Sequence, residues 1–309
     1  MRLATIDLGS NTVRLLVAEV VRRGSWTPVH EEQRVTRLGE GLAAGGELGG
    51  APMARTAATV REYVERARTL GASRIRIVGT SAIRDARNGR WFAATLERDT
   101  GAPVDVVSGE DEARLAVRGV LDGLGRPRGT LIVFDIGGGS TEYIRIRDGA
   151  IVAATSLRLG VVPLAEQFPF PRPAEAGRYR AMADDVGRRL RRELPASIQA
   201  TDVDELVGTA GTVTTLAALD LGLETYDRGR VQGHRLSRDA LARQGARLSA
   251  LTVEERAALP CLEPGRADLV LPGLAIVEET LDLLGVASLV VSDAGLREGM
   301  MAEAAEKYA

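Results

Sequence analysis

The decisive stretch of this chain is Asp135-Ile136-Gly137-Gly138-Gly139-Ser140-Thr141-Glu142 (DIGGGSTE). It joins a hydrophobic run at 130–135 to an alternating run at 140–146, which predicts two strands around a glycine-rich turn. A similar pattern occurs in the first half of the chain, where DLGSN at 7–11 joins a hydrophobic run at 2–7 to another at 12–20. In both places an aspartate ends the first strand. A repeat at this separation predicts two domains of one topology.

Both turns have the composition of a phosphate-binding loop. Consecutive backbone N–H groups hold phosphate oxygens, glycine lets the backbone come close, and serine or asparagine adds side-chain donors. A carboxylate at the strand end can hold a hydrated Mg²⁺ that bridges to phosphate. One such turn alone can be a simple tight hairpin, but two matched turns favour phosphate binding. The predicted phosphate contacts in these turns are Gly9, Ser10, Asn11, Gly137, Gly138, Gly139, Ser140 and Thr141, and the predicted Mg²⁺ ligands are Asp7, Asp135 and Glu142.

The rest of the chain alternates strand and helix patterns, which predicts an α/β protein. Helices are expected at about 54–70, 89–100, 110–121, 179–194, 238–250 and 267–284, and further strands at 74–79, 104–107, 205–208 and 288–291. The segment 123–129 (GLGRPRG) is rich in helix breakers and marks the expected domain boundary. The predicted domains are therefore residues 1–125 and 126–309.

Composition limits the chemistry that the chain can perform. Its 309 residues suffice for two domains, and a net charge of −2 gives no general attraction for nucleic acid. No run of about 18 apolar residues predicts a membrane span. The N-terminal stretch does not resemble a signal peptide, and a single cysteine fits a cytoplasmic protein. Lys307 is the only lysine and follows no glycine-rich loop, which excludes a Walker A motif, and two histidines with one cysteine argue against histidine- or cysteine-rich metal centres.

Three other segments leave alternatives open. The carboxylates in SGEDEAR at 108–114 can be a solvated helix start, which the helix dipole favours, or can include a general base for an attacking water. In TSAIRDARN at 80–88, Arg84 either faces phosphate from a strand-end loop or pairs with Asp85 on the surface. In GTAGT at 208–212, Gly208 and Gly211 either permit close packing or approach a bound polyanion or nucleotide, and we favour the second interpretation.

Six motifs occur here in the order found in the exopolyphosphatase/guanosine pentaphosphate phosphatase family, which the chain resembles from Asp7 to Gly299. They are DLGSN, TSAIRDARN, SGEDEARL, DIGGGSTE, GTAGTVTT and SDAGLREG. More broadly, the paired loops resemble the Hsp70, actin and sugar kinase superfamily. The resemblance implies two ribonuclease-H-like (actin-like) domains with a cleft between them, and a last helix at about 296–309 that packs back on the first domain.

The resemblance also implies an activity. The family base is the glutamate just before Ala-Arg, which corresponds to Glu112, although Asp111 stands where the family more often has glutamate. The expected reaction is hydrolysis of the terminal phosphoanhydride bond of inorganic polyphosphate, with release of orthophosphate and with Mg²⁺ or another divalent cation as cofactor. The family further implies a homodimer. The chain stops soon after SDAGLREG, so we expect short polyphosphates or a nucleotide as substrate, with weak processivity on long chains.

Three alternative functions stay open at this point. The first is hydrolysis of guanosine pentaphosphate to the tetraphosphate, since both activities occur in the family. The second is an ATP-dependent kinase of the same superfold, against which the Glu112 context argues because it favours water as the acceptor. The third is a non-catalytic alarmone sensor, against which the intact carboxylates at Asp7, Glu112, Asp135 and Glu142 argue.

Overall fold

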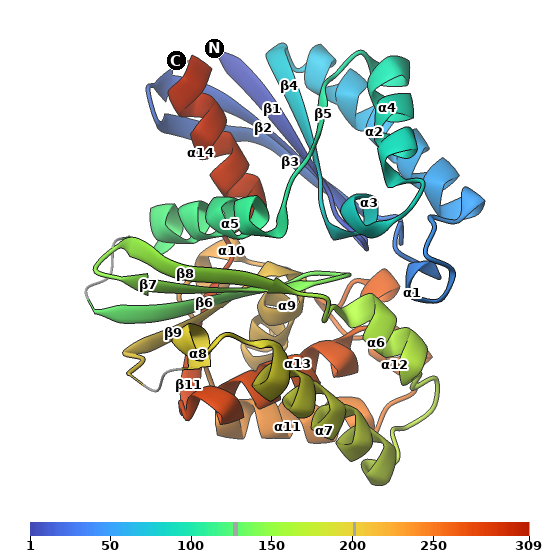
Figure 1. Cartoon of the computed structure of the whole chain (residues 1–309), viewed down its shortest axis with the longest axis vertical. Helices are drawn as coiled ribbons and strands as arrows, with labels where there is room; N and C mark the ends of the chain where they lie inside the picture. Colours follow the sequence, from blue (N-terminus) through green and yellow to red (C-terminus); the bar gives the residue numbers. More distant parts are fainter. Residues whose placement is uncertain (126–128, 200–201, 309) are drawn as a thin grey trace. The chain divides into compact units, whose positions relative to one another are not determined.

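The structure is a computed structural model that describes residues 1–125, 129–199 and 202–308. The chain forms two compact units (Figure 1). Unit 1 comprises Met1–Gly119 together with the residues from Gly295 onward, and unit 2 comprises Val120–Ala294. The chain therefore leaves unit 1 within one helix and returns to it at the last one.

Unit 1 is built on a five-stranded sheet with the strand order β3-β2-β1-β4-β5. The antiparallel strands β1–β3 come first, and β4 and β5 then run parallel to β1. The elements of this unit are β1 (Arg2–Leu8), β2 (Thr12–Arg22), β3 (Ser25–Val35), α1 (Leu42–Gly45), α2 (Gly50–Thr69), β4 (Ala72–Gly79), α3 (Ser81–Asp85), α4 (Gly89–Thr100), β5 (Val104–Val106), α5 (Gly109–Leu124, which crosses into unit 2) and α14 (Leu296–Tyr308).

Unit 2 repeats this arrangement on a six-stranded sheet of order β10-β11-β9-β6-β7-β8. Strands β6–β8 form the antiparallel set, while β9 and β11 run parallel to β6. The elements are β6 (Thr130–Ile136), β7 (Thr141–Arg147), β8 (Ala150–Leu157), α6 (Val161–Gln167), α7 (Ala176–Glu193), α8 (Ala196–Gln199), β9 (Glu205–Thr209), α9 (Ala210–Asp220), α10 (Arg228–Val231), β10 (Arg235–Ser237), α11 (Arg238–Ser249), α12 (Val253–Ala257), a 3₁₀ turn (Pro264–Arg266), α13 (Val270–Leu284) and β11 (Ser288–Ser292).

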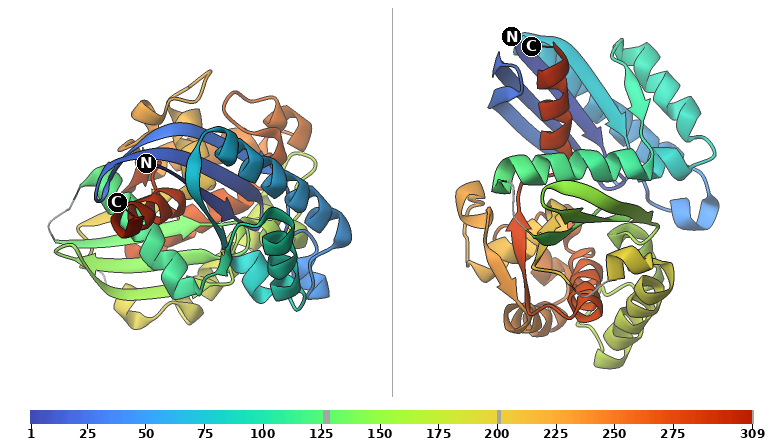
Figure 2. Two further views of the ribbon diagram at one scale, coloured as in Figure 1. Left: turned by 90° about the horizontal axis from the view of Figure 1, so that it is seen from above. Right: turned by 60° about the vertical axis from the view of Figure 1, so that its left-hand side comes forward.

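The central strands β1 and β6 are buried almost throughout, as their unbroken hydrophobic runs require. Helices α2 and α4 cover one face of the unit 1 sheet, and α14 packs against β1, β2 and β3. In unit 2 the long apolar helix α13 packs against α7, α9 and α11. Figure 2 shows the N-terminus and the end of α14 close together at one end of unit 1. The predicted α/β class with two actin-like domains is confirmed.

Three local features differ from the sequence expectation. The segment 80–88 contains the short helix α3 where a loop is expected. Strands β3, β8 and β10 have no counterpart among the predicted strands. Helix α5 continues to Leu124, into the segment at which the sequence places the domain boundary, and residues 126–128 of that segment lie outside the described residues.

Candidate functional site

The first predicted loop is a closed turn at the end of β1. The Gly9 N–H donates to the Thr12 carbonyl at 3.2 Å, and a Cβ on Gly9 would lie only 2.9 Å from the same oxygen. The Ser10 hydroxyl accepts from the Ala82 N–H of α3 at 3.1 Å, which ties the turn to the end of β4. Among the described residues, the N–H groups of Ser10 and Asn11 have no partner. The turn thus presents two adjacent donors, as an anion-binding nest does.

Asp7, beside this turn, is a buried carboxylate. Arg14 lies across the hairpin with its Nη1 4.0 Å from Asp7 Oδ2, while Oδ1 has no hydrogen-bond partner in the described part of the chain. Burial raises the pKa of Asp7 to about 6, against the opposing effect of Arg14 and Arg297. A buried oxygen without a partner in native proteins calls for an explanation, and an ion is one of those available.

Arg84 and Glu112 form an ion pair in unit 1. Arg84 Nη1 donates to Glu112 Oε2 at 2.7 Å and to the Val107 carbonyl at 3.3 Å, and its Nε lies 3.7 Å from Asp85. The surface pairing with Asp85 that the sequence leaves open is thus the longer of the two contacts. The sequence predicts that Arg84 contacts phosphate, and the structure shows that its guanidinium also binds Glu112, the predicted base.

Only one of the three neighbouring acidic residues at the start of α5 is buried. Ser108 precedes the helix: its hydroxyl accepts from the Asp111 N–H at 3.1 Å and donates to the Asp111 carboxylate at 2.9 Å. This cap fixes where the helix begins. Glu112 is then 8% exposed, whereas Glu110 and Asp111 are exposed. The interpretation as a solvated helix start therefore holds for Glu110 and Asp111 but not for Glu112.

The second predicted loop has the same closure in unit 2. The Gly137 N–H donates to the Ser140 carbonyl at 2.9 Å, and the carbonyls of Gly137 and Gly138 accept from the first residues of α6. Among the described residues, the N–H groups of Gly138 and Gly139 have no partner. The Thr141 hydroxyl donates to the Leu159 carbonyl, so this side chain anchors the turn.

Asp135 and Glu142 lie directly opposite one another on β6 and β7. Side chains in this relation point to the same face of a sheet, with Cβ atoms roughly 5 Å apart. The strand register extends the row to Ser156 on β8 and Thr209 on β9. Glu142 is 1% exposed and accepts from the Ser156 hydroxyl at 2.7 Å. The sheet therefore holds two carboxylates in one polar row.

The two glycines of the third loop have different surroundings. A Cβ on Gly208 would meet the Phe134 ring at 2.9 Å, so its lack of a side chain permits packing inside unit 2. A Cβ on Gly211 would lie 1.9 Å from Nη1 of Arg266. Gly211 thus leaves room for the Arg266 guanidinium at the start of α9.

The next question is whether the carboxylates described above are suited to hold a divalent cation. No group of three or more histidine, cysteine or acidic side chains in the described part of the chain is gathered as a metal cluster. Mg²⁺ is usually held by one or two carboxylates together with waters and substrate phosphates. The lone buried oxygen of Asp7 and the opposed pair Asp135–Glu142 fit that pattern, because each leaves most of the coordination sphere to other ligands.

Several residues beside these positions have no role in the sequence analysis. Arg297 and Glu298 both influence the pKa of Asp7, and Glu298 is 5% exposed and accepts from the Gly295 N–H at 2.9 Å. Both residues belong to the motif SDAGLREG, which the sequence analysis recognised. The sequence did not indicate that this motif lies close to Asp7. Arg14 was detectable as the residue opposite Asp7 in a two-stranded hairpin. Arg266 lies in a loop-like context that resembles the family's, but the sequence alone assigns it no role.

Two sheets of one topology, each with an acidic strand end followed by a glycine-rich turn, define a two-domain protein of the actin-like type. The chain belongs to the Ppx/GppA phosphatase family, whose model matches residues 16–308. This confirms the resemblance and the enzyme class. No described helix is both long and apolar enough to span a membrane.

Three relatives illustrate the family match. Exopolyphosphatase 2 of Mycobacterium tuberculosis is 35% identical over 314 residues, covering 97% of this chain and 97% of its own. A guanosine-5'-triphosphate,3'-diphosphate pyrophosphatase of Photobacterium profundum is 32% identical, covering 98% of this chain and 59% of its own. The crystal structure of the Ppx/GppA family member of Aquifex aeolicus has a TM-score of 0.82 at 32% identity, covering 99% of this chain and 98% of its own.

Proposed function

We propose that the chain is an exopolyphosphatase that releases orthophosphate from the end of inorganic polyphosphate. The observation that carries the proposal is the burial of Glu112 alone among its acidic neighbours, with its carboxylate held by Arg84. A fixed carboxylate is what proton removal from an attacking water requires. The full-length similarity to an exopolyphosphatase supports polyphosphate as the substrate.

Each residue in the proposed site has a distinct task. Within unit 1 the N–H groups of Ser10 and Asn11 hold phosphoryl oxygens, and within unit 2 the N–H groups of Gly138 and Gly139 have the same task. Glu112 orients a water and accepts its proton, and Arg84 keeps the Glu112 carboxylate in place. The proton transfer contributes on the order of 10²–10⁴-fold, while positioning and charge stabilisation supply the greater part of the acceleration.

Mg²⁺, or another divalent cation, is the proposed cofactor, and the proposed ligands are Asp7 within unit 1 and Asp135 with Glu142 within unit 2. When bound, it would neutralise charge on the phosphoryl oxygens. The family resemblance also supports a cytoplasmic homodimer. Sedimentation equilibrium tests the dimer, for which we expect twice the chain mass of 32.9 kDa, whereas the monomer mass would contradict it.

Guanosine pentaphosphate is the second candidate substrate, supported by the similarity to the Photobacterium enzyme. Phosphate release should be compared on short polyphosphate, long polyphosphate and guanosine pentaphosphate at equal Mg²⁺. We expect the highest kcat/KM on polyphosphate. Release from the nucleotide alone would favour the second candidate. Formation of ADP from ATP and a sugar would replace both by a kinase, and binding without any turnover would indicate a sensor.

A further inference from the structure

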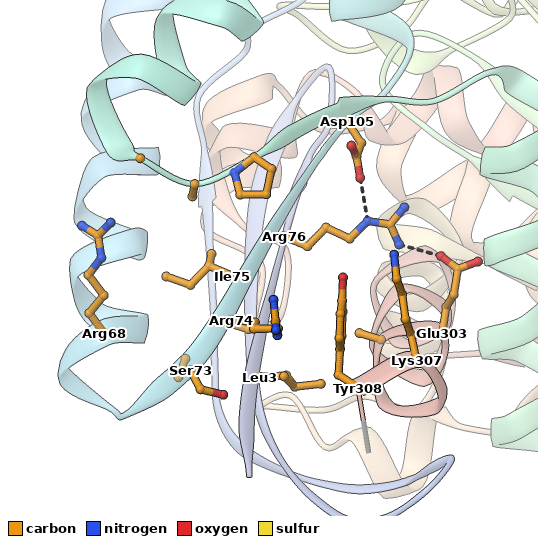
Figure 3. A pocket seen from close by; sticks show the side chains of 16 residues that line it. Leu3, Arg68, Ser73, Arg74, Ile75, Arg76, Asp105, Glu303, Lys307 and Tyr308 are labelled. Atoms are coloured by element: carbon orange, nitrogen blue, oxygen red, sulfur yellow. Dashed lines mark hydrogen bonds and ion pairs between the residues drawn. The ribbon is translucent and has the colours of Figure 1, made fainter.

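A cavity of about 730 Å³ opens at the edge of the unit 1 sheet, at the start of β4. It arises because β5 is short and pairs with β4 only from Ile77 to Gly79. The first half of β4, residues 72–76, therefore has a neighbouring strand on the β1 side only. The end of α2, the segment 101–103 and the last turns of α14 complete the walls (Figure 3). The volume falls within the usual range of small-molecule sites, roughly 300–1,000 Å³.

The walls of this cavity are more cationic than anionic. Four basic side chains, Arg68, Arg74, Arg76 and Lys307, face two carboxylates, Asp105 and Glu303. Both carboxylates are already bound to Arg76, Asp105 at 2.9 Å and Glu303 at 2.5 Å. Arg68 is paired with Glu65 outside the cavity at 2.6 Å, so the positive charges that the acidic residues do not balance are those of Arg74 and Lys307.

Arg74 and Lys307 lie on either flank of one aromatic ring. The Arg74 guanidinium carbon is 4.7 Å from the centroid of the Tyr308 ring, and Lys307 Nζ is 5.2 Å from it. The two charges are thus no more than about 10 Å apart, which is about one Debye length at moderate salt. In the described part of the chain neither has a carboxylate within ion-pair distance. Figure 3 shows Lys307 and Tyr308 side by side on α14, with their polar ends directed towards Arg76.

We propose that this cavity binds a phosphoryl-bearing anion, with Arg74 and Lys307 as its main contacts. Arginine offers a planar fork that matches phosphate oxygens, and lysine adds a compact charge. The Tyr308 ring holds both cations near one another, and a bound anion relieves their repulsion. Apolar side chains such as Leu3 and Ile75 leave space for an organic group attached to the phosphate. The source is either an inorganic oligophosphate or a nucleotide.

The cavity is separate from the proposed catalytic residues. Arg74 stands five residues before Gly79 on β4, which is roughly 17 Å along an extended strand. Arg84 follows beyond that strand end. Binding in the cavity can therefore be measured without changing a residue of the proposed site, and its failure would leave the proposed exopolyphosphatase activity untouched.

The test uses two natural reporters in the full chain. Trp26 packs against the same apolar cluster as Tyr308, while the other tryptophan, Trp91, is exposed. In a Trp91→Phe background, Trp26 fluorescence is titrated with tripolyphosphate, ATP and adenosine in EDTA, which removes divalent cations and prevents turnover. Lys307 is the only lysine, so acetylation read by mass spectrometry reports on this one ε-amino group.

We expect saturable binding of tripolyphosphate or ATP, and protection of Lys307 over the same concentration range. The double variant Arg74→Ala/Lys307→Ala should bind at least about tenfold more weakly, as loss of charge-assisted hydrogen bonds predicts. The matched control is Arg23→Ala/Arg90→Ala, which removes the same charge from two exposed positions outside this cavity and should change binding less than about twofold.

Each outcome bears on the proposal. ATP binding more than about tenfold tighter than tripolyphosphate would identify a nucleotide site, and equal binding would identify an inorganic phosphate site. The proposal is overturned if neither anion protects Lys307, if adenosine binds as tightly as ATP, or if the control variant loses as much affinity as the cavity variant. Unchanged unfolding midpoints for both double variants exclude misfolding as the cause.

Discussion

Replacing Asp7 by asparagine removes a charge that the fold buries without a full set of partners. The carboxylate is 5% exposed, and its Oδ1 has no hydrogen-bond partner among the described residues. Asparagine has nearly the same shape and stays neutral at every pH. The variant should therefore lose phosphate release while the metal-free protein becomes more stable, which is the usual exchange at a strained functional position.

The magnitude follows from the shift in pKa. Asp7 has a pKa of about 6 in the folded protein against an ordinary value of 3.8, so the folded state holds its proton more tightly. At about 1.36 kcal/mol per unit, deprotonation destabilises the folded state by up to about 3 kcal/mol. Below pH 3.8 the Asp7 carboxyl is neutral, and the folded wild type is not destabilised by it. As the pH rises from 3.8 through about 6 the carboxyl loses its proton, and the folded protein loses this stability. The advantage of Asp7→Asn should thus be absent near pH 4 and largest above pH 7.

Urea unfolding in EDTA across this pH range measures the difference, with the exposed Asp239→Asn as the matched control. Mg²⁺ should then stabilise the wild type more than the variant, by about 2.7 kcal/mol at a hundredfold excess over Kd. An Asp7→Asn protein that is less stable than the wild type at pH 8 would refute the reasoning. A difference that does not vary with pH would refute it equally.

Two further substitutions test the metal position and the helix packing of unit 1. Ser156→Ala removes the donor to Glu142 and should raise the Mg²⁺ concentration needed for half-maximal phosphate release by about tenfold or more, so an unchanged Mg²⁺ titration would exclude Glu142 as a ligand. Gly299→Ala places a methyl group 1.8 Å from the Leu115 carbonyl and should destabilise the protein by about 2–3 kcal/mol in urea, because α5 and α14 must separate. Gly177→Ala changes a helical glycine whose added Cβ would meet no other atom within 4 Å, so it should be neutral or stabilising. An equal loss in both variants would contradict the packing argument.

The sequence predicts those parts of the fold that local chemistry determines. The turns at Gly9 and Gly137 follow buried strands and are bounded by small polar residues, so both hairpins could be recognised without tertiary information. Strand β3 could not be recognised, because none of its residues is buried, it contains Pro28 and it shows no sustained hydrophobic alternation. Helix α3 has only five residues and depends on the distant Ser10 hydroxyl at its first turn.

In the candidate site, too, some features could be predicted from local sequence and others depend on tertiary contacts. A cluster of three carboxylates was evident, but only the helix start set by Ser108 decides that Glu112 is the buried one. The influence of Glu298 on Asp7 joins residues from opposite ends of the chain, which no local pattern can reveal. The pairing of Arg84 with Glu112 likewise depends on how two separate strand ends meet. Local sequence thus indicated the reactive groups, and tertiary packing determined their partners.

The central claim is that Glu112 removes the proton from the attacking water. The most direct measurement is Mg²⁺-dependent phosphate release from polyphosphate by Glu112→Gln, beside Glu110→Gln as an exposed control on the same helix turn. We predict a fall of at least about 100-fold in kcat for Glu112→Gln with substrate binding retained, and less than a twofold change for Glu110→Gln. Near wild-type turnover by Glu112→Gln, or an equal loss in both variants, would contradict the assignment.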